Sequence, residues 1–131
     1  SAVDSASSPT PVVNGTLARF VYQSNWLSGT PKHPNHRAFL PPPDGQLSMF
    51  QIDGLVASEV CALGAVARSG ALKFYGWAEL NIVSVQLVGL RALRDDKPHR
   101  HVTVDGWPTD GKESVKMRAI ELAAVSQFTA C

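Results

Sequence analysis

The four histidines of this 131-residue chain form two close groups, His33-Pro-Asn-His36 and His99-Arg-His101. Histidine changes its charge near neutral pH, so it serves as a general acid or base and as a metal ligand. The two groups therefore mark the segments where a chemical site is most readily built. No motif in the chain has a spacing that demands one mechanism, so the elements that carry the histidines have to be considered next.

The second group lies in residues 99–105, a segment that predicts a β-strand. Side chains alternate along a strand, so His99, His101 and Thr103 are expected on one face and the intervening valines on the other. The valines indicate which face of the strand points into the core. We therefore predict both imidazoles on the face that points away from the helices.

The first group lies in residues 25–45, which hold five of the nine prolines. Each proline favours extended backbone in the residue before it, so this segment predicts an ordered loop and not a helix. Loops of this length in compact domains are often functional. If the loop crosses the face that carries His101, then His33, His36 and Arg37 join it there.

Three interpretations of the histidines stay open. In the first, His33 and His36 bind a metal together with one or both of His99 and His101, and Asp105 or Asp44 supplies a carboxylate. Zinc and similar ions accept such imidazole-rich sites. However, the first group lies on a proline-broken loop and no cysteine accompanies it. We predict no metal and no cofactor. In the second interpretation the histidines are ordinary polar residues on a solvated surface.

The third interpretation is metal-free acid–base chemistry on a phosphoester. His101 would be the principal acid or base, His99 or His36 its counterpart, and Arg37 the clamp for an anion. The residues His101-Val-Thr-Val resemble one copy of the His-x-Thr/Ser-hydrophobic motif of the two-histidine phosphoesterases. That family carries two copies, and neither His33 nor His36 supplies the second. Ser48 and Ser84 lack a Gly-x-Ser-x-Gly elbow, so the sequence does not predict a serine hydrolase triad.

The remaining sequence predicts one α+β domain over residues 16–131, preceded by a flexible leader over residues 1–15. Residues 81–88 are ambiguous, because their β-branched content favours a strand whereas Asn81 and Gly89 are typical of helix ends; we prefer a short helix. We expect a mostly antiparallel sheet of four to five strands with two or three helices packed on one face. The predicted strands are 16–24, 46–52, 76–80, 90–94 and 99–105. Two of the predicted helices are 57–68 and 81–88. The third is a C-terminal helix that begins with a capping box at Asp110 and Glu113 and ends at Phe128.

Composition excludes several classes of protein. The formal net charge of +1 provides no basic surface for duplex nucleic acid, and no apolar stretch approaches the ~20 residues of a membrane helix. A charge near zero permits self-association. Cys61 and Cys131 are expected as one buried thiol and one loose thiol, which favours reducing, cytoplasmic surroundings.

We expect the function of a small, soluble, non-enzymatic binding or accessory domain that acts through a protein partner. The proline- and tryptophan-containing loop suits recognition. The residues predicted to take part in binding are Trp26, His33, Arg100 and Trp107. The alternative is a small histidine-dependent enzyme or toxin-like factor that acts on a phosphoester, a nucleotide or RNA.

Overall fold

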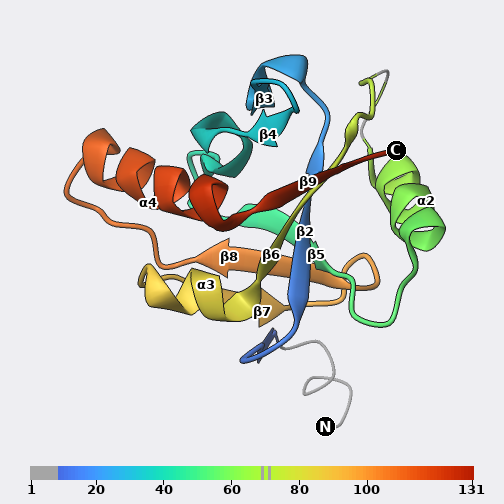
Figure 1. Ribbon diagram of the computed structural model, residues 1–131. Coiled ribbons are helices and arrows are strands. Elements are labelled where there is room, and N and C mark those ends of the chain that lie inside the picture. Colours follow the sequence, from blue (N-terminus) through green and yellow to red (C-terminus); the bar gives the residue numbers. More distant parts are fainter. Residues whose placement is uncertain (1–8, 69, 71) are drawn as a thin grey trace, which may run out of the picture.

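The computed structural model describes residues 9–68, 70 and 72–131. Within this part of the chain, seven strands form one antiparallel sheet in the order β1-β7-β8-β5-β2-β6-β9 (Figure 1). A separate two-stranded pair lies above it and consists of β3 (Leu27–Ser28) and β4 (His33–Pro34). The strands of the large sheet are β1 (Thr10–Pro11), β2 (Thr16–Val21), β5 (Leu47–Gln51), β6 (Gly76–Asn81), β7 (Arg91–Arg94), β8 (His101–Asp105) and β9 (Gln127–Ala130).

The sheet separates two apolar clusters, because its central strands are apolar on both sides. On β2, Leu17 belongs to one cluster and Ala18 and Phe20 belong to the other. We call the first side the closed face, because α3 (Ile82–Leu87), α4 (Lys112–Val125) and the 3-10 helix η2 (His36–Phe39) all bury residues in its cluster. The opposite side is the open face, where α2 (Ala57–Ala67) packs over part of the sheet.

The two shorter α-helices are fixed by local contacts at their first turns. The Glu59 carboxylate accepts a hydrogen bond from the backbone N–H of Val56 at the start of α2. The Asn81 side chain accepts one from the backbone N–H of Val83, so it caps α3. The helix that we preferred for residues 81–88 is confirmed.

Helix α4 is shorter than the sequence predicts at both ends. Gly111 precedes its first turn with a φ of 141°, and no side-chain cap forms there, so the expected capping box at Asp110 and Glu113 is absent. The helix ends at Val125, and the chain continues as β9 along β6. A Cβ atom at Gly76 would overlap the carbonyl of Thr129, so glycine at this position lets β9 approach.

The α+β class is confirmed, but two details of the prediction are wrong. The sheet has seven strands where four to five were expected, because the short edge strands β1 and β9 lack a recognisable alternating pattern. The helices also lie on both faces and not on one. The physical reason is that Phe20, Phe50 and Trp77 project from the open face and need the cover that α2 provides.

The loop predicted over residues 25–45 folds onto the closed face. It contains the end of the 3-10 helix η1 (Ser24–Trp26), the β3–β4 pair and η2. Ala38 and Phe39 of η2 are fully buried in the same cluster as Leu122 of α4. The loop therefore does not cross the face that carries His101.

The N-terminal boundary also differs from the expected leader over residues 1–15. Residues 1–8 lie outside the described residues, but Thr10 and Pro11 pair with Arg94 and Leu93 of β7. The sheet therefore includes residues that the sequence assigned to the leader.

Cys61 and Cys131 form a disulfide, with their Cα atoms 5.7 Å apart. The prediction of two thiols is wrong, and the argument for a reducing compartment loses its basis. The reason is that β9 carries Cys131 back to the side of α2 (Figure 1), a path that a longer C-terminal helix would not take.

No helix in the described part of the chain combines the length and apolar content needed to cross a membrane.

Candidate functional site

A chain of hydrogen bonds joins three side chains on the open face. His101 Nδ1 lies 2.7 Å from Asp95 Oδ1, and His101 Nε2 lies 2.6 Å from Ser48 Oγ. The imidazole thus stands between a carboxylate and a hydroxyl and contacts each through a different ring nitrogen. This is the connectivity by which serine hydrolases activate their nucleophile.

The pairing of β5 with β8 sets the distance between Ser48 and His101. Gln51 donates its backbone N–H to the carbonyl of Arg100, and the register pairs Ser48 with Thr103. Because hydrogen-bonded and non-hydrogen-bonded pairs alternate along an antiparallel ladder, Ser48 and Thr103 form a non-hydrogen-bonded pair, whose side chains lie close together. His101 is then the diagonal neighbour of Ser48 on the same face.

An aromatic side chain holds the imidazole ring in place. Phe50 pairs with His101 across the strands, and the two rings meet edge to face with their centroids 5.3 Å apart. The His101 side chain retains 15% of its exposure, whereas Ser48 is exposed. The imidazole is therefore held against the margin of the open-face cluster, and the hydroxyl that it contacts remains accessible to solvent.

The carboxylate of Asp95 determines how a neutral His101 ring carries its proton. A carboxylate can only accept, so Nδ1–H donates to Asp95, and Nε2 is left to accept from the Ser48 hydroxyl. Partial burial alone would raise the pKa of Asp95. The hydrogen bonds from His101 and from the backbone N–H of Lys97 outweigh that effect and lower this pKa. Asp95 therefore stays ionised and suited to orient the imidazole.

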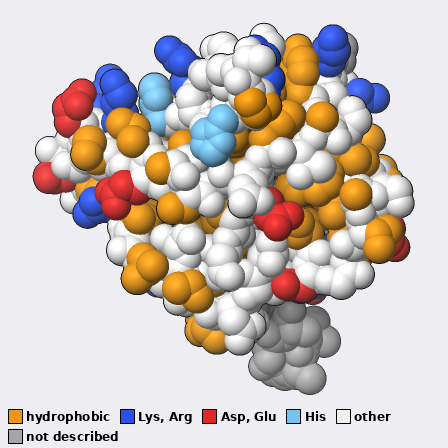
Figure 2. Space-filling view, viewed as in Figure 1, with side chains coloured by type: hydrophobic (Ala, Val, Ile, Leu, Met, Phe, Trp, Pro, Cys, Tyr) orange, Lys and Arg blue, Asp and Glu red, His pale blue; other side chains and the backbone are white. Residues whose placement is uncertain are grey.

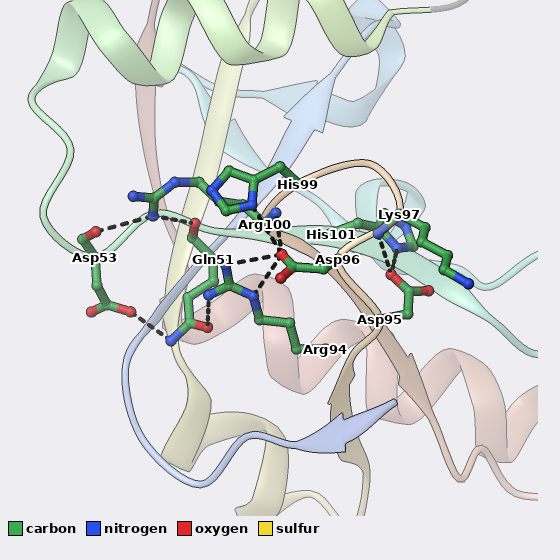
Figure 3. A network of polar contacts seen from close by, with 9 residues as sticks. All are labelled: Gln51, Asp53, Arg94, Asp95, Asp96, Lys97, His99, Arg100 and His101. Carbon is green, nitrogen blue, oxygen red and sulfur yellow. Dashed lines mark hydrogen bonds and ion pairs between the residues drawn. The ribbon is translucent and has the colours of Figure 1, made fainter. Parts of the chain in front are cut away.

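The turn between β7 and β8 is held by a network around Asp96 (Figure 3). The Asp96 carboxylate accepts hydrogen bonds from Arg94 Nε and from the backbone N–H of Arg100, and His99 Nδ1 lies 3.3 Å away. The backbone N–H of Arg100 is the main cause of a lowered pKa of Asp96. These contacts fix the turn in which Asp95 sits.

Arg19 supports the backbone at Ser48 from the closed face. Its Nη1 donates to the backbone carbonyl of Ser48 at 3.0 Å, and its Nε donates to the carbonyl of Ala38 at 2.7 Å. The guanidinium also stacks on Trp26, 4.9 Å from the ring centroid. Burial lowers the pKa of Arg19 to about 10. This side chain fills the gap where β2 and β5 diverge, so it positions the backbone that carries Ser48.

Two of the three side chains predicted on one face share it, and one does not. That face also carries α2, so the prediction that it points away from the helices is wrong. His101 and Thr103 project from the open face, but His99 is exposed in the turn before β8 and faces Asp96. The strand starts two residues later than predicted because Arg100 has a φ of 74°, which extended backbone does not allow. The two imidazoles therefore contact different aspartates and do not form a pair.

The first histidine group lies on the other side of the sheet from His101. His36 and Arg37 belong to η2, which packs on α4, and His33 Nε2 lies 2.9 Å from the carbonyl of Ala123. Burial, with smaller effects of Lys116 and Arg37, lowers the pKa of His36. The pairing of His101 with His36 and the anion clamp at Arg37 are therefore not formed. Within the described residues, no group of three or more His, Cys, Asp or Glu side chains could hold a metal ion.

The residues predicted for binding are spread over three places. Trp26 is half-buried against Arg19, and Arg100 Nη1 donates to the carbonyls of Gln51 and Asp53. Trp107 lines a pocket of about 950 Å³ between the proline-rich segment 40–46 and residues 105–116. The structure therefore does not gather these residues into one surface.

Sequence reasoning missed Ser48 and Asp95 as site residues. In the segment QLSMFQI, Ser48 stands between the buried Leu47 and Met49, so its side chain points to the other face of the strand. This alternation is a signal that the hydroxyl points away from the closed-face core. Asp95 lies in the turn between the strands predicted over 90–94 and 99–105, and its carboxylate accepts a hydrogen bond from the backbone N–H of Lys97. The register that unites them with His101 has no signature in either segment.

Charged side chains are unevenly placed on the face seen in Figure 2. Most basic side chains lie along its upper margin, and most acidic side chains lie at its left edge and below. Comparison with known protein families, with curated proteins and with solved structures found no match to this chain.

Proposed function

We propose that this chain is a small serine-dependent acyl hydrolase, with Ser48 as nucleophile, His101 as general base and Asp95 as the residue that orients His101. The observation that carries the proposal is the continuous hydrogen-bond chain Asp95–His101–Ser48, with lengths of 2.7 and 2.6 Å. Each partner uses the atom that general-base catalysis requires.

The reaction begins when Ser48 Oγ attacks the carbonyl carbon of an ester. Its proton passes to His101 Nε2, and the carbonyl oxygen becomes an oxyanion. Collapse of this intermediate breaks the bond to the leaving alcohol, which takes the proton from His101, and leaves an acyl group on Ser48. Water then attacks the acyl carbon with His101 again as the base. The carboxylic acid departs and Ser48 is restored.

Thr103 is the side chain best placed to stabilise the oxyanion. It pairs directly with Ser48 on the open face and is half-buried. The described residues supply no hydrogen-bond partner for its hydroxyl, which is therefore free to donate. A donor aimed at the developing charge contributes a large part of the rate in acyl transfer.

An acyl substrate fits this site better than the phosphoester that the sequence suggested as an alternative. A phosphoester needs a cation beside the reacting phosphate. The arginine expected for that purpose, Arg37, lies on η2 on the other side of the sheet, and the guanidinium of Arg100 is directed to the carbonyls of Gln51 and Asp53. The charge that develops in ester hydrolysis can be met by a hydroxyl donor instead.

The test combines turnover with covalent labelling. Wild-type protein is expected to hydrolyse p-nitrophenyl acetate and to gain one adduct from a fluorophosphonate reagent, located at Ser48 by peptide mass spectrometry. Ser48→Ala is expected to lose at least about 10³-fold in kcat/KM and all labelling. Ser84→Ala is the matched control, because Ser84 lies on α3 outside the hydrogen-bond chain.

His101→Ala and His36→Ala separate this proposal from one that uses the other histidine group. The first should abolish labelling, and the second should leave it unchanged, since His36 lies on the opposite side of the sheet. If folded wild-type protein leaves Ser48 unmodified, the proposal is wrong. The non-enzymatic, protein-binding role expected from the sequence would then be the prediction left to examine.

A further inference from the structure

The two edge strands of the large sheet differ in what their backbones offer to a further strand. Strand β1 forms one edge and β9 forms the other (Figure 1). Next to β1, Val12 donates its backbone N–H to the carbonyl of Ala92 on β7, so the backbone of Pro11 faces outward. Proline has no N–H, and the outward position of β1 therefore offers no donor. This leaves β9 as the edge on which another strand can pair.

The pairing of β9 with β6 determines which backbone groups of β9 face outward. Cys131 donates its backbone N–H to the carbonyl of Tyr75, and Thr129 is paired with β6 in the same phase. Because the hydrogen-bonding direction alternates along a strand, the N–H and C=O groups of Phe128 and Ala130 point away from β6. Within the part of the chain that the structure describes, these groups have no backbone hydrogen-bond partner.

Strand β9 also has none of the side chains that usually protect a free edge. Its residues are Gln-Phe-Thr-Ala, whereas protected edges typically carry lysine, proline or an inward-pointing charge. Gln127, Thr129 and Ala130 are exposed, and Phe128 is half-buried. Strand β4 contacts β9, but its backbone pairs with β3 and does not use the outward groups. The edge of β9 is therefore open to a strand.

We infer that β9 pairs antiparallel with β9 of a second copy of this chain, so that two sheets join into one across a two-fold axis. With Thr129 at the axis, Phe128 of each copy lies opposite Ala130 of the other. Each of these pairs exchanges both of its hydrogen bonds, and every outward group of β9 then has a partner. The edge is thus complementary to itself, and the blocked edge at β1 stops the assembly at two copies.

The side chains of β9 are compatible with this pairing. Thr129 lies opposite Trp77 of the open-face cluster, so the Thr129 side chains of the two copies meet on the open face. They form a non-hydrogen-bonded pair, in which side chains are closest and threonine pairs are favourable. On the closed face, the small Ala130 leaves room for the Phe128 ring of the other copy. Because β9 carries no charge, the two edges do not repel each other.

Sedimentation velocity of the whole chain up to about 1 mM measures the association, because a small edge-to-edge interface gives a weak dimer. Ala130→Pro removes one outward N–H from each copy and keeps the hydrogen bonds between β9 and β6. It should raise the dissociation constant by about tenfold or more, since two hydrogen bonds of the dimer are lost. Ala130→Ser is the matched control, because it keeps the N–H and should retain the dimer.

A charge exchange at position 129 tests the two-fold axis itself. Thr129→Lys and Thr129→Glu each place two like charges opposite one another, so each protein alone should dissociate at tenfold or more higher concentration than the wild type. An equimolar mixture of the two should form a heterodimer again. Thr10→Lys is the control at the other edge, because Thr10 is exposed on β1, and it should leave the dimer unchanged.

Wild-type protein that stays monomeric throughout this range would overturn the inference. A dimer that survives Ala130→Pro and both charge variants would also overturn it, because the contact would then lie elsewhere on the surface. Neither result affects the proposed function, since Ser48 and His101 lie on β5 and β8 and not at this edge.

Discussion

The closed and open faces of the sheet are made by the same strands but differ in what covers them. On the closed face, Leu47 and Met49 of β5 are fully buried beneath η2 and α4. On the open face, Ser48 of the same strand remains exposed beside His101. Both faces bury an apolar cluster, but the cluster on the closed face is the larger one. Polar side chains beside the smaller open-face cluster can therefore remain in positions that contribute little to stability.

The alternation of buried and accessible side chains along β5 has a physical advantage for the candidate site. Strand side chains alternate, so rigid burial of Leu47 and Met49 fixes the backbone on both sides of Ser48. Arg19 adds a second restraint by donating to the Ser48 carbonyl from the closed face. Sites built on rigid elements keep their geometry more accurately than sites on loops. The comparison predicts that truncation of buried closed-face side chains reduces stability, and that changes to the polar side chains around Ser48 on the open face reduce rate.

Asp95→Asn should give the largest effect. The amide no longer favours the ring form in which Nε2 accepts from Ser48, and the equivalent change in a serine protease lowers kcat about 10⁴-fold. Steady-state hydrolysis of p-nitrophenyl acetate measures this loss, and thermal unfolding should show a much smaller change. If Asp95→Asn protein instead unfolded, while the fraction that stays folded hydrolysed the ester at the wild-type rate, the distinction between the two faces would be wrong.

Loss of the disulfide should give the next largest effect, and on stability alone. Cys61 and Cys131 close a loop with a sequence separation of 70 residues. In the chain-entropy account, removal of such a link costs about 4 kcal/mol of unfolding free energy. Urea unfolding of Cys61→Ala/Cys131→Ala protein measures it. Labelling of Ser48 below the transition should be unchanged, and a lost adduct would show that the disulfide also shapes the site.

Leu122→Ala tests the closed face directly. Leu122 is fully buried in the cluster with Phe39, so truncation should lower the unfolding free energy by about 3 kcal/mol. The matched control is Leu87→Ala, because Leu87 is 81% exposed on α3 and should cost less than about 0.5 kcal/mol. Equal effects for the two variants in urea unfolding would mean that the closed face is not the stabilising one.

Thr103→Val sharpens the assignment of roles on the open face. Valine keeps the shape of threonine and removes the hydroxyl proposed to meet the oxyanion. We expect a loss of about 10²-fold in kcat with little change in KM, as for other oxyanion donors. A rate equal to that of the wild type would remove Thr103 from the proposed mechanism and leave the triad itself untouched.

Acid titration should show the smallest effect. The pKa of Asp95 is lowered in the folded state, so the unfolded chain binds this proton first as the pH falls. The stability linked to Asp95 is therefore present above the usual aspartate pKa of about 3.9 and is lost below it. Between pH 7 and pH 3, Asp95→Asn should lose less unfolding free energy than the wild type. Parallel curves of unfolding free energy against pH for the two proteins would show that ionisation of Asp95 is not linked to folding.

Much of the fold could be read from local patterns. The helix over 57–68 and the strands around 46–52 and 99–105 follow from periodicity, because apolar spacing reports which face of an element is buried. Asn81 identified the start of α3 by its capping chemistry. Strand β9 could not be found in this way, because Phe128 extends the apolar spacing of the preceding helix and its pairing with β6 depends on Gly76, far away in sequence.

The candidate site, like the fold, could be predicted from the sequence only in part. The sequence by itself determined that His101 and Thr103 share a face opposite the buried valines, since alternation is a property of any strand. Only the tertiary structure decided that Ser48 and Asp95 are the partners of His101, and that His36 is not. The reason is that the partners are set by strand register and by the side of the sheet on which a loop packs, and both depend on contacts between residues that are distant along the chain.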